Sequence, residues 1–312
     1  MAQLTTPTTP GNKGDRLLLE RQFRQAQRQA IDDELDQRIR EHARNVRRWH
    51  RAQQFKKRAN VPLDFLAVGD SWFDYPLYDN ALLYPWDWGI VAQQHNLGIL
   101  GTPPPLILSL AHWGWASTQV LAWQNQQTMI DKIEAGSWIN GNGPDAILAS
   151  FGGDDIAGDQ LAIYLTYGGH LPTASTRFQG VLDLVQASYE DLIAFRDIFA
   201  PNAPIFAHCY DFPLASGLAA DGLAGPWLKP SFDFALYDSA GAQNVLHDMI
   251  QKFLTMLQTL AAVAKNNFYV VNTTGTITPS DWSNEIHPKP DGFYKLSLKF
   301  LAELQKHFPG RI

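Results

Sequence analysis

A serine and a histidine stand where the sequence allows nucleophilic catalysis. Ser71 lies in Gly69-Asp70-Ser71-Trp72, directly after a short apolar run at residues 65–68. A serine that ends a buried strand, beside a glycine that permits a tight turn, presents its hydroxyl above the sheet. That hydroxyl is a poor nucleophile until a base takes its proton and donors stabilise the oxyanion. Ser71 therefore needs a base from elsewhere in the chain.

His287 is the best candidate for that base. It follows the last apolar run, residues 268–271, and precedes the last helix-like segment, residues 292–307. Pro288 comes next and would stiffen the loop that bears the imidazole. Since imidazole titrates near neutral pH, it can accept a serine proton. Ser71 and His287 together predict acyl transfer.

The elements that must position these groups alternate along the chain. Short, nearly continuous apolar runs suit strands buried on both faces of a parallel sheet, with helices between them. Polar residues follow the runs, where functional groups of open α/β sheets collect. The runs cover residues 65–68, 106–110, 146–150, 205–210 and 268–271, and the helix-like segments cover residues 118–135, 182–198, 242–265 and 292–307.

Four short motifs, in this order, resemble those of the SGNH (GDSL-type) hydrolases. The resemblance covers roughly residues 62–308, and the order of the motifs makes it specific. It implies an α/β fold, a three-layer α/β/α sandwich with a central parallel sheet (flavodoxin-like), which agrees with the alternation above. The motifs are Gly69-Asp70-Ser71-Trp72, Gly114 within His112-Trp113-Gly114-Trp115-Ala116-Ser117, Gly152-Gly153-Asp154-Asp155, and His287-Pro288.

The resemblance also implies roles for individual residues. It makes Ser71 the nucleophile and His287 the general base. The backbone N–H groups of Ser71 and Gly114 would form part of the oxyanion hole. No cofactor is implied, and the histidines are scattered without metal-ligand spacing, so we expect no catalytic metal.

Asp154 departs from the family pattern, which usually has an asparagine whose amide completes the oxyanion hole. An ionised carboxylate at this position would repel the developing oxyanion. A protonated carboxyl group could instead donate to it, as burial in apolar surroundings permits. Both alternatives stay open from the sequence.

The acid of the triad is the second departure. The family places it three residues before the histidine, where this chain has Asn284. Asn284 could orient His287 but would stabilise the imidazolium poorly. We therefore favour Asp281, six residues before the histidine, with Asn284 or a backbone carbonyl as the alternative.

Aromatic residues surround the candidate nucleophile and the glycine of the second motif. Trp113 and Trp115 flank Gly114, and Trp72 follows Ser71. These three tryptophans could form an aromatic wall that binds substrate, or they could simply pack in the core.

The N-terminal part of the chain differs in charge from the rest. Residues 1–58 have a net charge of +7, and residues 59–312 have a net charge of −13. We expect a flexible tail at residues 1–14, a charged amphipathic helical arm at residues 15–60 and the hydrolase domain at residues 61–312. The arm has one apolar stripe, formed by Ile31, Leu35, Ile39, Val46 and Trp49.

That stripe must be covered, either by the main domain or by a second copy in a homo-oligomer. We expect the arm to be separable from the chemistry. Seven interspersed acidic residues would oppose phosphate contacts, so we expect no nucleic-acid partner. No apolar stretch approaches the ~20 residues of a membrane span, and no secretory signal is recognisable. With Cys209 as the only cysteine, we expect a cytoplasmic location.

The sequence as a whole predicts a serine esterase. It would hydrolyse a carboxylic (acyl or acetyl) ester through a covalent acyl-serine intermediate, and its substrate would be a small-molecule ester or an acylated sugar. The alternative is a catalytically weakened SGNH-fold protein that binds a carbohydrate or an acylated ligand. Asp154 and Asn284 are the features that favour this alternative.

Overall fold

The computed structural model describes residues 13–55, 61–75, 105–168, 176–220 and 224–311. Within these ranges lies one sheet of five parallel strands in the order β2-β1-β3-β4-β5. This is the strand order of flavodoxin-like sheets. The strands are β1 (Asp64–Gly69), β2 (Leu106–Ser109), β3 (Ala146–Ser150), β4 (Ile205–His208) and β5 (Phe268–Val271).

The predicted apolar runs coincide with these strands. The strands are mostly apolar because both faces of the sheet are covered. Every residue of β1, β3 and β4 is buried. At the carboxyl end of β1, Gly69 is aligned with Ser150 of the neighbouring strand. A Cβ at Gly69 would lie 2.2 Å from the carbonyl oxygen of Ser150, so only glycine fits immediately before the turn that bears Ser71.

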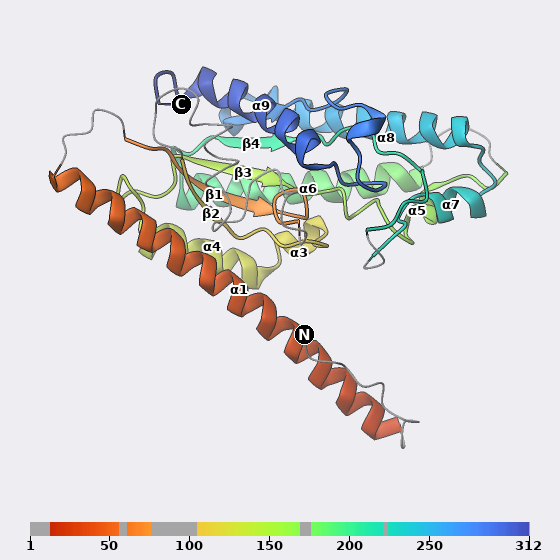
Figure 1. Cartoon of the computed structure of the whole chain (residues 1–312), viewed down its shortest axis with the longest axis horizontal. Coiled ribbons are helices and arrows are strands. Elements are labelled where there is room, and N and C mark those ends of the chain that lie inside the picture. Colours follow the sequence, from red (N-terminus) through yellow and green to blue (C-terminus); the bar gives the residue numbers. More distant parts are fainter. Residues whose placement is uncertain (1–12, 56–60, 76–104, 169–175, 221–223, 312) are drawn as a thin grey trace.

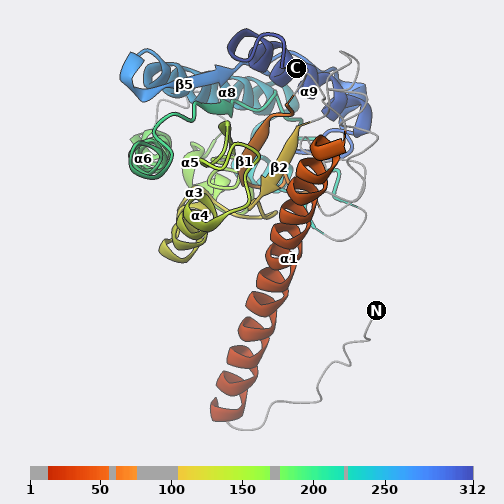
Figure 2. The ribbon, with the colours of Figure 1, turned by 90° about the vertical axis from the view of Figure 1, so that its left-hand side faces the viewer.

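Helices on both sides of the sheet complete a three-layer α/β/α sandwich, which confirms the predicted fold class. α6 and α9 lie on opposite sides of the sheet (Figures 1 and 2). The long helices after the strands are α4 (Trp123–Ala135), α6 (Thr176–Phe199), α8 (Ser239–Ala261) and α9 (Pro290–His307), and the short ones are α3 (Ser117–Val120), α5 (Leu161–Tyr164) and α7 (Lys229–Phe234).

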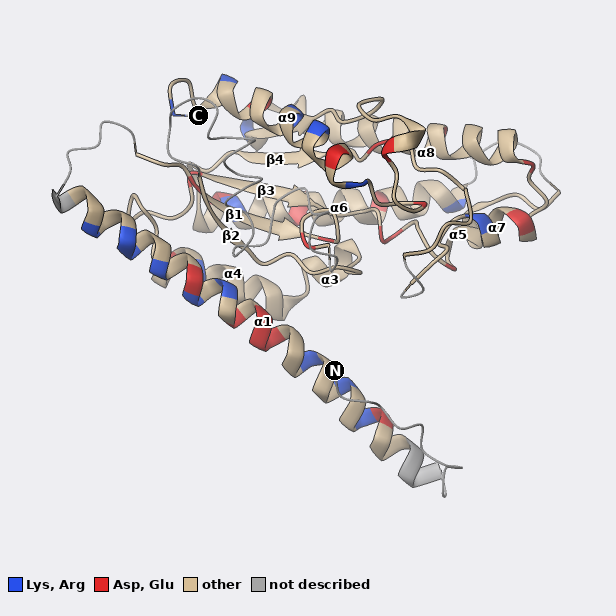
Figure 3. Ribbon diagram, in the orientation of Figure 1, with Lys and Arg blue, Asp and Glu red and all other residues tan. Residues whose placement is uncertain are grey.

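The N-terminal arm is one long helix, α1 (Lys13–Phe55), and it carries many of the cationic residues (Figure 3). Its C-terminal half lies against β2 at the edge of the sheet, while residues 17–30 are exposed and project from the body (Figures 1 and 2). Residues 1–12 of the predicted tail lie outside the described residues, and its last two residues, 13 and 14, belong to α1, so the helix begins two residues earlier than predicted. The end of the predicted arm, residues 56–60, also lies outside the described residues.

The buried face of α1 includes polar residues that the predicted stripe lacks. Leu35 and Val46 are buried as expected, but so are Arg38 and His42. His42 Nε2 lies 2.6 Å from an oxygen of the buried Asp64 at the start of β1. A buried charge or imidazole is stable only with such a partner, so these contacts fix the position of the helix along the sheet edge.

Candidate active site

Ser71 and His287 meet at the carboxyl edge of the sheet. Ser71 lies in the turn after β1, and His287 lies in the loop between β5 and α9. The serine Oγ and the histidine Nε2 are 2.7 Å apart, a hydrogen bond between residues 216 positions apart in sequence. This is the geometry that a nucleophile and its general base require.

Asn284 orients the imidazole. Its Oδ1 lies 3.1 Å from His287 Nδ1 and accepts hydrogen bonds from the backbone N–H groups of His287 (2.9 Å) and Ile286 (3.1 Å). Two backbone donors identify this atom as the oxygen, so the Nδ1 beside it must bear a proton. The neutral ring then presents the Nε2 lone pair to the Ser71 hydroxyl, which is the tautomer of a general base.

Asp281, which we favoured as the orienting acid, has other partners. Its carboxylate accepts hydrogen bonds from the backbone N–H and the hydroxyl of Thr278, both at 2.8 Å, and from Lys295 Nζ at 2.7 Å. The bond from Lys295 is the main reason that the pKa of Asp281 falls to about 2. The side chain beside His287 is thus Asn284, because Asp281 sits in a short 3-10 turn (Pro279–Asp281) that directs it toward α9.

The imidazole of His287 is enclosed. It is buried, with the ring centroid of Tyr75 at 4.2 Å and that of Trp227 at 5.5 Å. Burial lowers the pKa of His287 to about 3, since the charged form loses solvation. The sequence did not point to Tyr75, whose hydroxyl accepts a hydrogen bond from Asn284 Nδ2 at 3.1 Å.

Two backbone N–H groups of the first two motifs have no acceptor among the described residues. They belong to Ser71 and to Gly114, the pair that the family pattern assigns to the oxyanion hole. Gly114 is exposed and has a φ of +76°, a left-handed conformation that favours glycine. Backbone donors without an acceptor in the described part of the chain are the kind of group that can stabilise an oxyanion.

Asp154, at the usual asparagine position, lines the same cavity as Ser71. Its carboxylate makes no hydrogen bond or ion pair with the residues that the structure describes. Burial raises the pKa of Asp154 well above its usual value, and the negative charges of Asp70 and Asp155 raise it further. The protonated form is therefore favoured over a wider pH range than for an ordinary aspartate.

A network of buried polar residues holds the turn that bears Ser71, called the nucleophile turn below. Asp70 accepts hydrogen bonds from Trp72 N (3.0 Å), Ser150 Oγ (2.8 Å) and the Tyr210 hydroxyl. Burial raises the pKa of Asp70 to about 6 against the effect of these donors. Tyr210 also accepts a hydrogen bond of 3.0 Å from Gly153 N, so the network joins the first and third motifs.

One buried carboxylate holds the backbone at residue 217 and at residues 227–229. Glu285 accepts hydrogen bonds from the backbone N–H groups of Gly217, Trp227, Leu228 and Lys229 at 2.5 to 2.9 Å. Since Glu285 lies two residues before His287, it links these two segments to the loop that bears His287. Its position next to the histidine motif was the only signal in the sequence.

A mostly apolar cavity opens beside Ser71, with about 650 Å³ of empty space including its open mouth. Concave, mostly apolar sites with a few polar groups are typical of small-molecule binding. One wall comes from α8, and the opposite wall includes the nucleophile turn. Its apolar lining residues are Trp72, Ile156, Ala157, Pro213, Leu228, Leu246, Met249, Ile250, Phe253, Trp282 and Ile286.

The three tryptophans do not form a single wall. Trp72 is buried, donates from Nε1 to the Ile286 carbonyl at 3.1 Å and lines the cavity. Trp113 and Trp115 lie in the loop of Gly114, each stacked against the His112 ring, and neither lines this cavity. Trp113 is half exposed, at 49%.

The described residues contain no cluster of three or more histidine, cysteine or acidic side chains that could hold a metal ion. In the same part of the chain, no helix is long and apolar enough to cross a membrane.

Comparisons with known proteins give a similarity of fold. No protein-family model matches the chain, and no curated protein matches its sequence. A lipase from a goat rumen metagenome is similar in structure, with a TM-score of 0.50 and 17% sequence identity over 77% of this chain and 96% of the lipase.

Two further structures align over most of their length at lower scores. They are an extracellular lipase from Streptomyces rimosus (TM-score 0.43, 17% identity, 77% of this chain and 99% of the lipase) and phospholipase A1 from Streptomyces albidoflavus (TM-score 0.44, 12% identity, 78% and 99%). The likeness to the rumen lipase shows that the two chains share an α/β fold.

Proposed function

We propose that this protein is a serine esterase that hydrolyses carboxylic esters through an acyl-enzyme intermediate on Ser71. The observation that supports it most is the 2.7 Å contact between Ser71 Oγ and His287 Nε2, with Asn284 accepting from the other ring nitrogen. An imidazole kept neutral and in the base tautomer is suited to take the serine proton.

In the proposed reaction, His287 Nε2 takes the proton as Ser71 Oγ attacks the ester carbonyl carbon. The oxyanion that forms accepts hydrogen bonds from the N–H groups of Ser71 and Gly114, and from Asp154 in its protonated form. As the tetrahedral intermediate collapses, the carbon–oxygen ester bond breaks and the leaving alcohol takes the proton from His287. Water, deprotonated by the same nitrogen, then hydrolyses the acyl-Ser71 ester.

The cavity favours binding of an apolar acyl group over a charged or strongly polar one. Its lining is mostly apolar, so a charged acyl group would lose its hydration there without gaining a partner. We therefore propose uncharged esters with an aliphatic or aromatic acyl chain as substrates, in preference to a polysaccharide chain, which would need an open polar groove.

A fluorophosphonate probe with mass mapping of the labelled peptide tests the proposal. We expect label on Ser71 of the wild-type protein and none on Ser71→Ala, together with loss of p-nitrophenyl ester hydrolysis by several orders of magnitude. Circular dichroism would check that the variant folds. Folded wild-type protein that takes up no label, or a variant that retains more than about a tenth of the activity, would contradict the proposal.

A further inference from the structure

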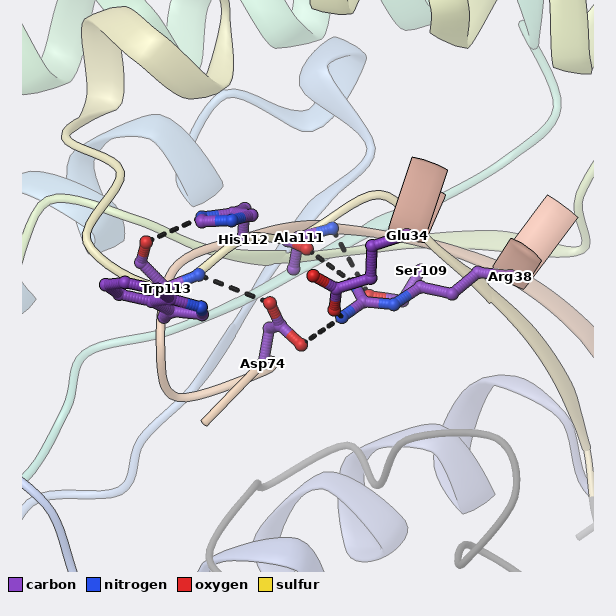
Figure 4. Close-up of polar contacts among 7 residues, drawn as sticks. All are labelled: Glu34, Arg38, Asp74, Ser109, Ala111, His112 and Trp113. Carbon is purple, nitrogen blue, oxygen red and sulfur yellow. Dashed lines mark hydrogen bonds and ion pairs between the residues drawn. The ribbon is translucent and has the colours of Figure 1, made fainter. Parts of the chain in front are cut away.

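Arg38, on the N-terminal helix α1, contacts Asp74, in the segment after Ser71, and Ala111, in the segment before Gly114 (Figure 4). Its side chain is buried, with 5% of the residue exposed. Nη1 donates a 2.7 Å hydrogen bond to the carbonyl oxygen of Ala111, and Nη2 forms an ion pair with Asp74. Glu34, one turn earlier on the helix, pairs with the same guanidinium.

Asp74 passes this contact on to the loop of the second motif. One of its oxygens pairs with Arg38, and the other accepts a 3.3 Å hydrogen bond from the backbone N–H of Trp113 (Figure 4). Asp74 follows Ser71 by three residues, and Trp113 directly precedes Gly114. The ion pair therefore joins the nucleophile turn to the glycine loop.

Other hydrogen bonds also hold the loop of Gly114, which is itself exposed. His112 N donates a 3.0 Å hydrogen bond to the carbonyl oxygen of Gly69, and His112 Nδ1 lies 2.7 Å from the carbonyl oxygen of Trp113. The contacts of Arg38 and Asp74 add to these at Ala111 O and Trp113 N. Without the guanidinium, the Ala111 carbonyl would lose its side-chain donor and the buried Asp74 would lose its counter-charge. Both losses favour rearrangement of the loop.

We propose that Arg38 is a positioning residue of the oxyanion hole, and that the N-terminal arm thereby contributes to catalysis. This inference rests on the proposed esterase activity. An oxyanion donor works only when it is held in place, and a shift of about 1 Å can cost on the order of 10²-fold in rate. Arg38 lies outside the part of the chain that resembles the hydrolase family, so its role is an addition to that family pattern.

The first measurement compares Arg38→Met with Arg40→Met in the full-length protein. Arg40 lies on the same helix but is exposed, and its ion-pair partner is Asp36 at 3.8 Å. We expect Arg38→Met to lower kcat for p-nitrophenyl butyrate about 10- to 100-fold with KM changed less than about twofold. The rate of fluorophosphonate labelling should fall in parallel. Arg40→Met should match the wild type in both.

Two more variants separate positioning from stability. Arg38→Lys keeps the charge but lacks the planar fork that reaches two acceptors, so we expect an intermediate kcat. Asp74→Asn keeps an acceptor for Trp113 N and removes the orphaned buried charge. The double variant Arg38→Met/Asp74→Asn should therefore recover thermal stability but keep the low kcat, with effects on kcat that are not additive.

Each outcome decides the inference. A wild-type protein that neither hydrolyses esters nor takes up the label overturns the proposed function and this inference together. An active wild type with normal kcat in Arg38→Met overturns the inference alone. If Arg38→Met does not fold, Arg38→Lys and the double variant decide, and wild-type kcat in both overturns it. A change in melting temperature without a change in kcat would make Arg38 a structural residue only.

Discussion

Asn284 is the residue that orients the side chain of His287. It fixes the tautomer through its oxygen but brings no negative charge, so burial alone sets the low pKa of the imidazole. The proposed esterase gains from His287 being neutral at almost any pH. It loses the stabilisation of the imidazolium that a carboxylate gives as the proton is transferred.

Substitution at this position should affect rate, while substitution of Asp281 should not. We expect Asn284→Ala to lower kcat by ~10²-fold or more, because the ring loses its tautomer constraint, against less than about threefold for Asp281→Ala. Steady-state kinetics on both variants checks this. Equal and small effects would mean that backbone or water orients the histidine.

The same position offers a matched gain-of-charge variant. Asn284→Asp places a carboxylate beside Nδ1, where the Tyr75 hydroxyl can turn to donate to it. The new charge should raise the pKa of His287 by roughly 1–3 units from about 3, so the acid limb of kcat/KM moves up by that amount. A limb that stays at the wild-type pH would show that His287 does not control it.

Asp154 should control the alkaline side of the pH profile. Its pKa in the folded protein is raised, so the group is a donor below that pKa and a repelling anion above it. We expect kcat/KM of the wild type to fall as pH rises through the folded pKa, and Asp154→Asn to remove this fall while changing the rate little at lower pH. A kcat that rises ~10-fold or more at every pH would show that Asp154 is always ionised.

The raised pKa also predicts a change in stability with pH. A group whose pKa is higher in the folded state stabilises the fold below its unfolded pKa, and that stability is lost as pH rises through the folded pKa. Asp154→Asn should therefore melt at a higher temperature than the wild type at pH 8, with the difference shrinking toward pH 4. Thermal unfolding at both pH values tests the sign.

At the scale of elements, α8 is the wall of the cavity and should set the preferred acyl chain. Ile250 is partly buried and lines the cavity, whereas Gln258 on the same helix faces solvent. We expect Ile250→Trp to lower kcat/KM for p-nitrophenyl octanoate ~10-fold or more, with a smaller loss for the acetate, because the indole fills space that the longer chain needs.

Gln258→Trp is the control for adding an indole to this helix, and it should leave both substrates unaffected. A parallel loss for acetate and octanoate in Ile250→Trp would instead indicate a general disturbance of the site. Equal kcat/KM for all chain lengths in the wild type would place the acyl group elsewhere.

At the scale of the whole molecule, the arm divides into two parts with different consequences. The projecting part includes the exposed apolar residues Leu17, Leu18, Leu19 and Phe23, while the docked part buries Leu35, Arg38, His42 and Val46. We expect deletion of residues 1–24 to leave melting temperature and kcat unchanged. Deletion of residues 1–58 should lower both and cause aggregation, because it uncovers the β2 edge and the apolar surface beneath the helix.

Light scattering and thermal unfolding of the two truncated proteins check this prediction. The same scattering data test the proposed homo-oligomer, since loss of a dimer on removing residues 1–24 would assign the contact to the projecting part. A protein without residues 1–58 that is monomeric, stable and fully active would show the arm to be an independent tether. The sequence led us to expect a loss of solubility or a changed oligomeric state, with the chemistry retained.

The sequence by itself was enough to predict the fold and the contact between two site residues. Five apolar runs coincide with the five strands, because burial on both faces leaves little choice of residue along a parallel strand. Ser71 and His287 each follow a strand, and parallel strands deliver their carboxyl ends to one edge of the sheet. Sequence order was therefore enough to predict a contact between residues 216 positions apart.

Only the tertiary structure decided between Asp281 and Asn284, since both lie in one loop and the local turn directs one to Lys295 and the other to His287. It also decided the role of the arm. Leu35, Arg38, His42 and Val46 recur at intervals of three or four residues, which is the spacing of one helix face. Burial of a cation on that face can be predicted only when its anionic partner is known. The partner of Arg38 is Asp74, which lies 36 residues away in the sequence. The spacing of residues within one helix gives no information about contacts at that separation.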